Sequence, residues 1–190
     1  MTKILFVCHG NICRSPAAEF VLRDLVVRAN MQQEFEVASA ATSSEELGNP
    51  VYPPMRRVLE SRGYYCDGKT ARRVRRSDYD TYDLIIGMDE ENLWNMRRIF
   101  GGDPEGKLHN LMDFAGFPGE EIADPWYTRD FVRAYEDVSM ACEGLLYHLT
   151  GTVSVDFTLC PDIPSLYREL RESSGGRTGT ARTWMRSMMC

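Results

Sequence analysis

Cys8 and Arg14 stand six residues apart in the octapeptide Cys-His-Gly-Asn-Ile-Cys-Arg-Ser, which directly follows the apolar residues 4–7. A thiol ionises near pH 8.5, and a helix N-terminus with nearby positive charge favours its nucleophilic thiolate form. Arginine carries a planar fork that can hold two phosphate oxygens at once, which lysine cannot do. The pair therefore predicts nucleophilic chemistry on a phosphate ester, with Cys8 as nucleophile and Arg14 as phosphate ligand.

The other residues of the octapeptide suit the same chemistry. Backbone N–H groups that run into a helix start can form an anion nest. We expect Gly10 to allow a tight turn through a positive φ, and Asn11 to tolerate a left-handed conformation and tie the loop down. We expect Ser15 to turn its hydroxyl towards the thiolate and to stand at the N-cap of a helix, with Pro16 as first helical residue. The predicted phosphate-binding residues are His9, Gly10, Asn11, Ile12, Cys13, Arg14 and Ser15.

The spacing Cys-x5-Arg alone is a weak signal. Cys66 and Arg72 share it, but Cys66 follows no apolar run and Arg72 precedes no capped helix, so we interpret Cys66 as incidental. The alternative for Cys8 is a structural cysteine buried at a strand end. Strand, loop and helix start together favour the nucleophile.

Phosphate transfer from an ester also requires a proton for the leaving oxygen. Asp124 can supply it as a carboxylic acid and can later activate water as a carboxylate. Pro125 stiffens this segment, and the rings of Trp126 and Tyr127 can line the site around an aromatic leaving group. An isolated Asp-Pro pair is otherwise typical of a turn.

The elements that must position these residues alternate between strand and helix. The patterns predict strands at 3–7, 35–40, 83–88 and 107–111. They also predict one helix that begins at 15, three further helices at 55–62, 90–100 and 128–149, and a long loop at 113–127. This order predicts an α/β domain, a three-layer sandwich with a central four-stranded parallel sheet flanked by helices. Ligands bind beyond the carboxyl ends of such strands, where the phosphate-binding loop follows the first strand.

Composition limits the remaining possibilities. The net charge of −6 and the lack of a long Lys/Arg run argue against binding to nucleic acid. No apolar run reaches the ~18 residues of a membrane span. Six scattered cysteines and three histidines without metal-ligand spacing favour reduced thiols over disulfides or zinc. We expect a cytoplasmic protein with no membrane association.

The character of the chain changes after Thr150. Residues 1–150 suit one domain, whereas residues 151–190 become rich in Ser, Gly, Thr and Arg. We predict that this extension is partly disordered or contains one short helix at 161–172. A docking segment that uses Trp184 and the nearby methionines is the alternative.

Several strings, in order along residues 3–149, resemble the low-molecular-weight protein tyrosine phosphatases. They are the run at 7–19 around the octapeptide, Ser-Ala-Ala-Thr-Ser at 39–43, Gly-Asn-Pro at 48–50, Ala-Arg at 71–72, Met-Asp with Asn-Leu at 88–93, and Asp-Pro-Trp-Tyr at 124–127. The resemblance implies hydrolysis of phosphotyrosine in proteins through a cysteinyl phosphate. It implies Cys8 as nucleophile, Arg14 as phosphate ligand and Asp124 as general acid and base.

The resemblance also implies supporting roles. Ser15 supports the thiolate, and Asn11 and Ser39 shape the loop. Cys13 is expected either to form a reversible disulfide with Cys8 or to be a small loop-packing residue. Phosphotyrosine-containing proteins are the implied partners and inorganic phosphate the product, with no metal or cofactor.

Two positions depart from the family pattern. Glu45, beside Glu46, stands where many members carry an aromatic residue that lines the substrate cleft. A carboxylate there would repel a dianionic ester and change the substrate preference. Lys69 replaces a histidine that often supports the loop, so we expect rearranged hydrogen bonds around it.

Three rival functions use a similar scaffold. An arsenate reductase would need further cysteines as an electron relay, and residues 81–101 contain none. A phosphoarginine phosphatase resembles this sequence but carries threonine at the position of Ile12, so Ile12 favours phosphotyrosine. A non-catalytic phosphate-binding module would have lost Cys8 or Asp124, and both are present.

Overall fold

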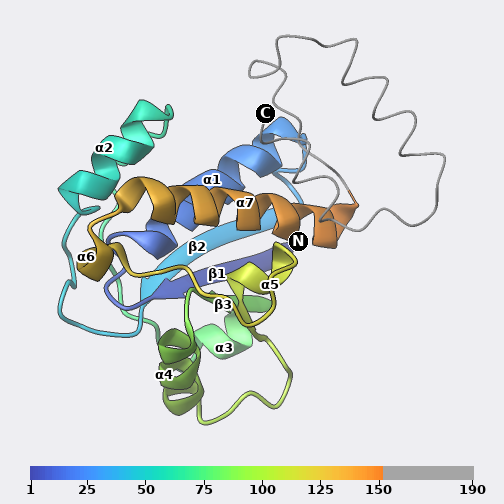
Figure 1. Ribbon diagram of the computed structural model, residues 1–190. Helices are drawn as coiled ribbons and strands as arrows, with labels where there is room; N and C mark the ends of the chain where they lie inside the picture. The colour runs from blue at the N-terminus through green and yellow to red at the C-terminus, as the bar shows by residue number, and fades with distance from the viewer. Residues whose placement is uncertain (152–190) are drawn as a thin grey trace. The chain divides into compact units, whose positions relative to one another are not determined.

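The computed structural model describes residues 1–151, which contain a four-stranded parallel sheet (Figure 1). The strand order is β2-β1-β3-β4, and β1 pairs with β2 from Thr2 opposite Phe35 to Cys8 opposite Ala41. The predicted α/β fold with a parallel sheet is therefore confirmed. The strands are β1 (Thr2–Cys8), β2 (Phe35–Ala41), β3 (Leu84–Gly87) and β4 (Leu108–Asn110).

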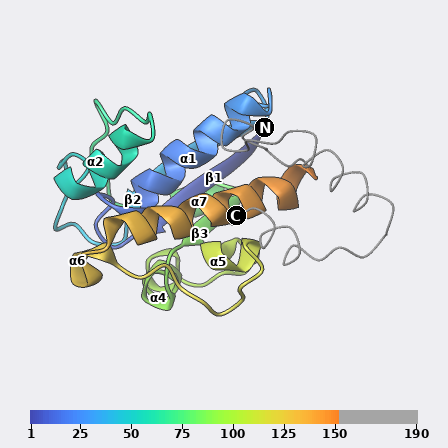
Figure 2. The ribbon, with the colours of Figure 1, turned by 45° about the horizontal axis from the view of Figure 1, so that its top comes forward.

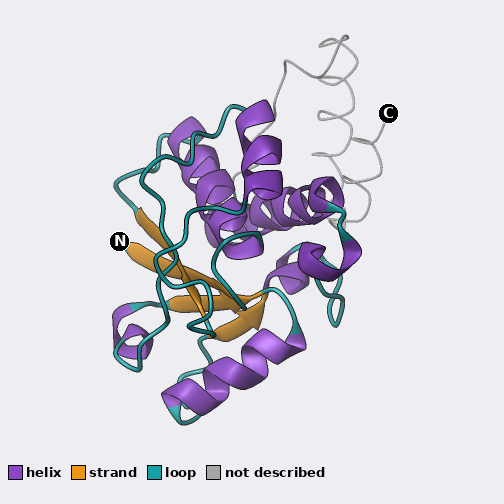
Figure 3. Ribbon diagram, turned by 90° about the vertical axis from the view of Figure 1, so that its left-hand side faces the viewer, coloured by secondary structure: helices purple, strands orange, loops and turns teal. Residues whose placement is uncertain are grey.

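Helices cover both faces of the sheet. One face carries α1 and α7, which pack side by side, and the other carries α3 and α4 (Figure 1, with other views in Figures 2 and 3). These layers give the predicted three-layer sandwich. The helices are α1 (Arg14–Arg28), α2 (Pro53–Ser61), α3 (Asp78–Thr81), α4 (Glu90–Phe100), α5 (Leu111–Phe114), α6 (Pro125–Thr128) and α7 (Phe131–Thr150). Neither α7 nor any other helix in residues 1–151 combines the length and apolar character that a membrane span needs.

Strand β1 is buried on both faces, which explains its continuous apolar run. Leu5 and Val7 belong to a core cluster with Leu93 and Met96 of α4. Alternation along a strand directs Phe6 to the opposite face, and its side chain is fully buried there. The strand is thus fixed from both sides, and so is Cys8 at its end.

Several predicted boundaries were wrong. Helix α1 begins at Arg14, so Pro16 is its third residue instead of its first. A proline is still tolerated there, since N–H groups of the first turn have no partner within the helix. Helix α7 begins at Phe131, because the Asp130 side chain accepts from the N–H of Arg133 at 2.9 Å and caps the helix there.

The segment 113–127, predicted as a loop, contains the end of α5 and the start of α6. Helix α3 was not predicted either. Each of these three helices has four residues, too short for a hydrophobic period to be recognised. The predicted helix at 161–172 lies outside the described residues.

Gly144 allows α7 to lie directly against α5. A Cβ atom at this position would stand 2.3 Å from the carbonyl oxygen of Phe114. No side chain fits in that space. The contact fixes the beginning of the segment that leads from α5 to Asp124.

Candidate active site

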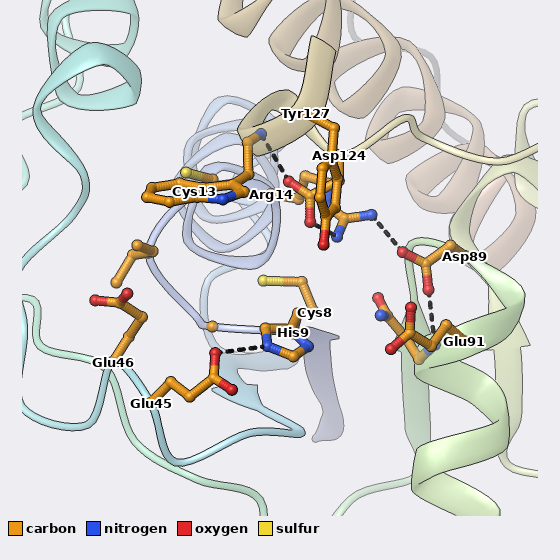
Figure 4. A pocket seen from close by; sticks show the side chains of 14 residues that line it. Cys8, His9, Cys13, Arg14, Glu45, Glu46, Asp89, Glu91, Asp124 and Tyr127 are labelled. Carbon is orange, nitrogen blue, oxygen red and sulfur yellow. Dashed lines mark hydrogen bonds and ion pairs between the residues drawn. The ribbon is translucent and has the colours of Figure 1, made fainter. Parts of the chain in front are cut away.

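A pocket of about 230 Å³ opens at the carboxyl ends of β1 and β3 (Figure 4). It contains most residues that the sequence predicted to act on phosphate. Its lining residues are Cys8, His9, Gly10, Ile12, Cys13, Arg14, Glu45, Glu46, Asp89, Glu91, Asn92, Asp124, Trp126 and Tyr127. The predicted supporting residues Asn11, Ser15 and Ser39 are buried and do not line it.

The sulfur of Cys8 lies within the curve of residues 8–15, which we call the phosphate loop. Ser15 Oγ lies 3.1 Å from Cys8 Sγ, and the backbone N–H of Asn11 donates to Sγ at 3.3 Å. The residue is only 3% exposed. The two groups are therefore placed to stabilise negative charge that develops on Sγ during a reaction.

The backbone of the phosphate loop is arranged for an anion. Its carbonyl groups accept from the segment beside it: Cys8 from Thr42 and His9 from Ser43, at 2.9 and 3.0 Å. The N–H groups of Gly10, Ile12 and Cys13 have no acceptor within residues 1–151. They remain available for phosphate oxygens.

Two residues of the phosphate loop behave differently from expectation. Asn11 has the expected left-handed conformation, with φ of 57°, but Gly10 lacks the positive φ that was expected of it. Gly10 is instead closely packed: a Cβ there would stand 3.1 Å from Glu46 Cγ, so the Glu46 side chain would have to shift. Ser15 does not cap α1, since its hydroxyl faces Cys8 and Asn11; Cys13 occupies the N-cap position without a side-chain hydrogen bond.

Asn11 holds the phosphate loop from behind. Its Nδ2 donates to Ser15 Oγ at 2.9 Å and to Ser39 Oγ at 2.8 Å. Its Oδ1 accepts from the N–H of Arg72 at 3.1 Å. The amide thus joins the loop to β2 and to the segment after α2, and its side chain is 1% exposed.

Lys69 extends this network towards the surface. Ser39 Oγ donates to Glu19 Oε2 at 2.5 Å, and Lys69 Nζ donates to the same oxygen at 2.6 Å. Arg23 pairs with the other oxygen of Glu19 at 2.8 Å. A buried carboxylate requires such partners, and Lys69 supplies one of the two cations that pair with Glu19.

Arg14 is held between two carboxylates. Its Nη1 contacts Asp89 Oδ2 at 2.5 Å, and its Nη2 contacts Asp124 Oδ2 at 2.6 Å. Nη1 also donates to the carbonyl of Ile122 at 3.0 Å. Burial alone would lower the pKa of the Arg14 guanidinium, but the negative charges of Cys8, Asp124 and Asp89 outweigh it and raise that pKa. Arg14 is therefore a fixed cation beside Cys8.

Asp124 has two tasks in the structure. Its Oδ1 accepts from the N–H of Trp126 at 2.9 Å and caps α6, and its Oδ2 faces Arg14. Pro125 occupies the first helical position, where its missing N–H costs nothing. The Trp126 ring packs on Tyr52 at a centroid distance of 5.5 Å, and Tyr127, 83% exposed, stands at the pocket mouth.

Carboxylates from two sides surround the mouth. Glu45, which replaces the aromatic residue that many family members carry, faces the phosphate loop. Its Oε2 lies 3.1 Å from His9 Nε2. Glu46 packs over Gly10, and its Oε2 accepts from Asn49 Nδ2 at 2.7 Å. Glu91 lies across the pocket from Glu46, near the start of α4 (Figure 4).

The sequence matches the model of one family. A family model described as low molecular weight phosphotyrosine protein phosphatase matches residues 3–155. The chain belongs to this family. The phosphatase is 35% identical over 147 residues to the low molecular weight protein-tyrosine-phosphatase YfkJ of Bacillus subtilis, an alignment that covers 77% of this chain and 94% of YfkJ.

Solved structures agree with this assignment. The crystal structure of YfkJ superposes with a TM-score of 0.76 at 34% identity, over 80% of this phosphatase and 96% of YfkJ. The crystal structure of DARP, a Drosophila arginine phosphatase, superposes with a TM-score of 0.72 at 30% identity, over 82% of this chain and all of DARP (100%).

The remaining cysteines of the described residues, Cys13, Cys66 and Cys142, are buried free thiols. Burial, with the negative charges of Cys8 and Asp124, raises the pKa of the Cys13 thiol. Cys13 is therefore protonated at neutral pH and does not compete with Cys8 as a nucleophile. Burial also raises the pKa of Cys66, which lies outside the pocket, in line with its interpretation as incidental. The reversible disulfide between Cys8 and Cys13 stays a prediction.

Four lining residues of the phosphatase had no role predicted from the sequence: Glu46, Asp89, Glu91 and Asn92. Asp89 caps α4 by accepting from the N–H of Asn92 at 2.6 Å while it holds Arg14. A signal was present, because Asp89 follows a buried strand parallel to β1. The carboxyl ends of neighbouring parallel strands meet at one sheet edge, which places Asp89 beside the phosphate loop.

Proposed function

We propose that this protein tyrosine phosphatase hydrolyses phosphotyrosine in proteins in two steps, through a phosphoryl group carried by Cys8. The observation that supports these roles is the meeting of three groups in one pocket: the Cys8 sulfur, the Arg14 guanidinium and the Asp124 carboxyl. They are a nucleophile, an anion ligand and a proton donor, which together satisfy the needs of the reaction.

In the first step the Cys8 thiolate attacks phosphorus. A sulfur–phosphorus bond forms, the bond from phosphorus to the tyrosine oxygen breaks, and Asp124 gives that oxygen its proton. The phosphate oxygens accept hydrogen bonds from the Arg14 guanidinium and from the free N–H groups of the loop. The phosphate thereby displaces Asp124 from Nη2. Displacement from Arg14 frees the Asp124 carboxyl to serve as the proton donor at the leaving oxygen.

In the second step a water molecule attacks the phosphoryl group on Cys8. Asp124, now a carboxylate, takes the water proton. The sulfur–phosphorus bond breaks, phosphate leaves, and the thiolate returns. Ser15 and the N–H of Asn11 stabilise the departing sulfur charge through the same contacts that they make in the free enzyme.

Phosphoarginine is the second candidate substrate, because a Drosophila arginine phosphatase has the same fold at 30% identity. Ile12 favours phosphotyrosine, since its apolar side chain lines the same pocket as the reacting Cys8. Phosphate release from matched phosphotyrosine and phosphoarginine peptides distinguishes the two.

The deciding experiment measures that release with EDTA present, for the wild type, Cys8→Ser and the matched control Cys66→Ser. We expect EDTA-insensitive release from phosphotyrosine that falls at least about 10⁴-fold in Cys8→Ser, since the nucleophile is lost. Cys66→Ser should retain activity within about threefold. Substantial turnover by Cys8→Ser would overturn the mechanism, and release from phosphoarginine alone would overturn the substrate.

We further propose that the phosphatase acts in the cytoplasm, on phosphotyrosine-containing proteins, with phosphate as product. The reaction needs a reduced Cys8, and the cytoplasm keeps thiols reduced. The other cysteines of residues 1–151, namely Cys13, Cys66 and Cys142, are also unpaired. Fractionation of cells that express the full chain tests this location.

A further inference from the structure

Five carboxylates stand around the Cys8 sulfur, and the positive charge of Arg14 offsets only part of their charge. Arg14 already pairs with two of them, and His9 pairs with Glu45. Glu46 and Glu91 have no cation within ion-pair distance in residues 1–151. The five are Glu45, Glu46, Asp89, Glu91 and Asp124 (Figure 4).

Such a lining is unfavourable for the substrate's own charge. A phosphotyrosine side chain brings a dianion, which binds at Arg14 but meets net negative potential on the way. Potentials of this kind change association rates by about 10- to 1,000-fold, according to the sign of the approaching charge. A substrate that carries positive charge beside the phosphotyrosine reverses the sign of this effect.

The two uncompensated carboxylates have definite positions relative to the reacting phosphate. The phosphate loop fixes the phosphorus next to Cys8, and Glu46 and Glu91 lie on opposite sides of that sulfur (Figure 4). A peptide chain that crosses the pocket along the line from Glu46 to Glu91 meets one carboxylate on each side of its phosphotyrosine. Neither carboxylate contacts Cys8 or Arg14, so their charges are available to the substrate.

We propose that the phosphatase selects phosphotyrosine segments with Lys or Arg on both sides of the phosphotyrosine. The selection rests on the proposed phosphotyrosine hydrolysis and adds the substrate class. Glu46 and Glu91, which we call the acidic rim, are the specificity-determining residues. Cationic side chains of the substrate pair with the acidic rim while its phosphate binds Arg14.

The test compares three phosphotyrosine peptides of equal length whose flanks carry Lys, Gln or Glu. At about 20 mM salt we expect kcat/KM for the Lys peptide to exceed that for the Glu peptide at least tenfold, mainly through KM. At about 0.5 M salt the ratio should fall to about twofold, because exposed charges are screened. Equal values for the three peptides at low salt would overturn the proposal.

Variants assign the effect to the acidic rim. In the double variant Glu46→Gln/Glu91→Gln the Lys-to-Glu preference should fall at least fivefold. The control Glu136→Gln, an exposed position on α7 outside the pocket, should keep the wild-type ratio. An unchanged ratio in the double variant would refute the assignment.

p-Nitrophenyl phosphate, measured in parallel, separates the two proposals. If the enzyme hydrolyses this ester in a Cys8-dependent manner but hydrolyses the three peptides equally well, the mechanism stands and the proposed selection is refuted. Failure to hydrolyse the ester and all three peptides refutes the proposed function and the selection together.

Discussion

The phosphate loop and the mouth of the pocket are built on different principles. In the loop, Cys8, Asn11 and Ser15 are at most 3% exposed and joined by hydrogen bonds. At the mouth, Trp126 is 45% and Tyr127 83% exposed. Buried contacts hold the loop in place, whereas the mouth exposes side chains that can meet a substrate.

The difference separates chemistry from selection. Backbone groups, a buried arginine and a buried amide hold the reacting atoms, so small changes there must disturb the reaction. Exposed side chains at the mouth contribute little to folding and can vary at low cost. Substitutions in the two regions should therefore differ in size and in kind.

The largest effect is expected from Arg14→Lys in the phosphate loop. Lysine keeps one positive charge but loses the fork that contacts Asp89 and Asp124 and that would hold two phosphate oxygens. We expect kcat/KM for p-nitrophenyl phosphate to fall about 100- to 1,000-fold.

The control for Arg14→Lys is Arg56→Lys, on the exposed face of α2, which should stay within about twofold. Near-normal activity of Arg14→Lys would mean that the point charge alone suffices. The phosphate loop would then not require a residue that contacts two phosphate oxygens at once.

An intermediate effect is expected from Asn11→Ala. Alanine is strained at φ of 57°, and the change removes two donors and one acceptor. We expect kcat/KM to fall about tenfold or more, and the free energy of unfolding to fall by about 1–3 kcal/mol in urea titrations.

Asn30→Ala is a matched control for the backbone strain. Asn30 has the same φ of 57° but lies exposed in the turn after α1. It should lose some stability and keep kcat/KM within about twofold. Equal losses of activity in the two variants would show that strain, and not the amide network, explains the Asn11 effect.

The smallest effect is expected from Tyr127→Ala at the mouth. The ring is exposed and would contact only an aromatic leaving group. We expect kcat/KM for p-nitrophenyl phosphate to fall about two- to fivefold, with unfolding unchanged within about 0.5 kcal/mol. Tyr147→Ala, exposed on α7, is the control; a loss as large as that of Asn11→Ala would break the contrast between the two regions.

Local patterns were sufficient to predict much of the fold. The apolar residues 4–7 predicted a buried strand because parallel strands are covered on both faces, and the alternation of elements predicted the sheet. The position of Cys8 after this strand followed from the same pattern. Four-residue helices such as α3 (Asp78–Thr81) contain too little periodicity to be predicted.

Errors inside the site came from competition between local and distant partners. Serine is a good N-cap, but the hydroxyl of Ser15 faces Cys8 and Asn11 and is not free to cap. The pairing of Lys69 with Glu19 joins residues 50 positions apart, so only the folded chain brings them together. The ion pairs of Arg14 with Asp89 and Asp124 likewise join distant segments of the chain.

The position of Arg14 between Asp89 and Asp124 has a consequence for inhibitor design. Phosphate mimics must displace Asp124 from the guanidinium before they bind, and their double charge also hinders passage through cell membranes. A singly charged cationic fragment that binds beside Asp124 would leave the ion pair intact and keep the arginine occupied. Compounds of this kind would compete with substrate without imitating it.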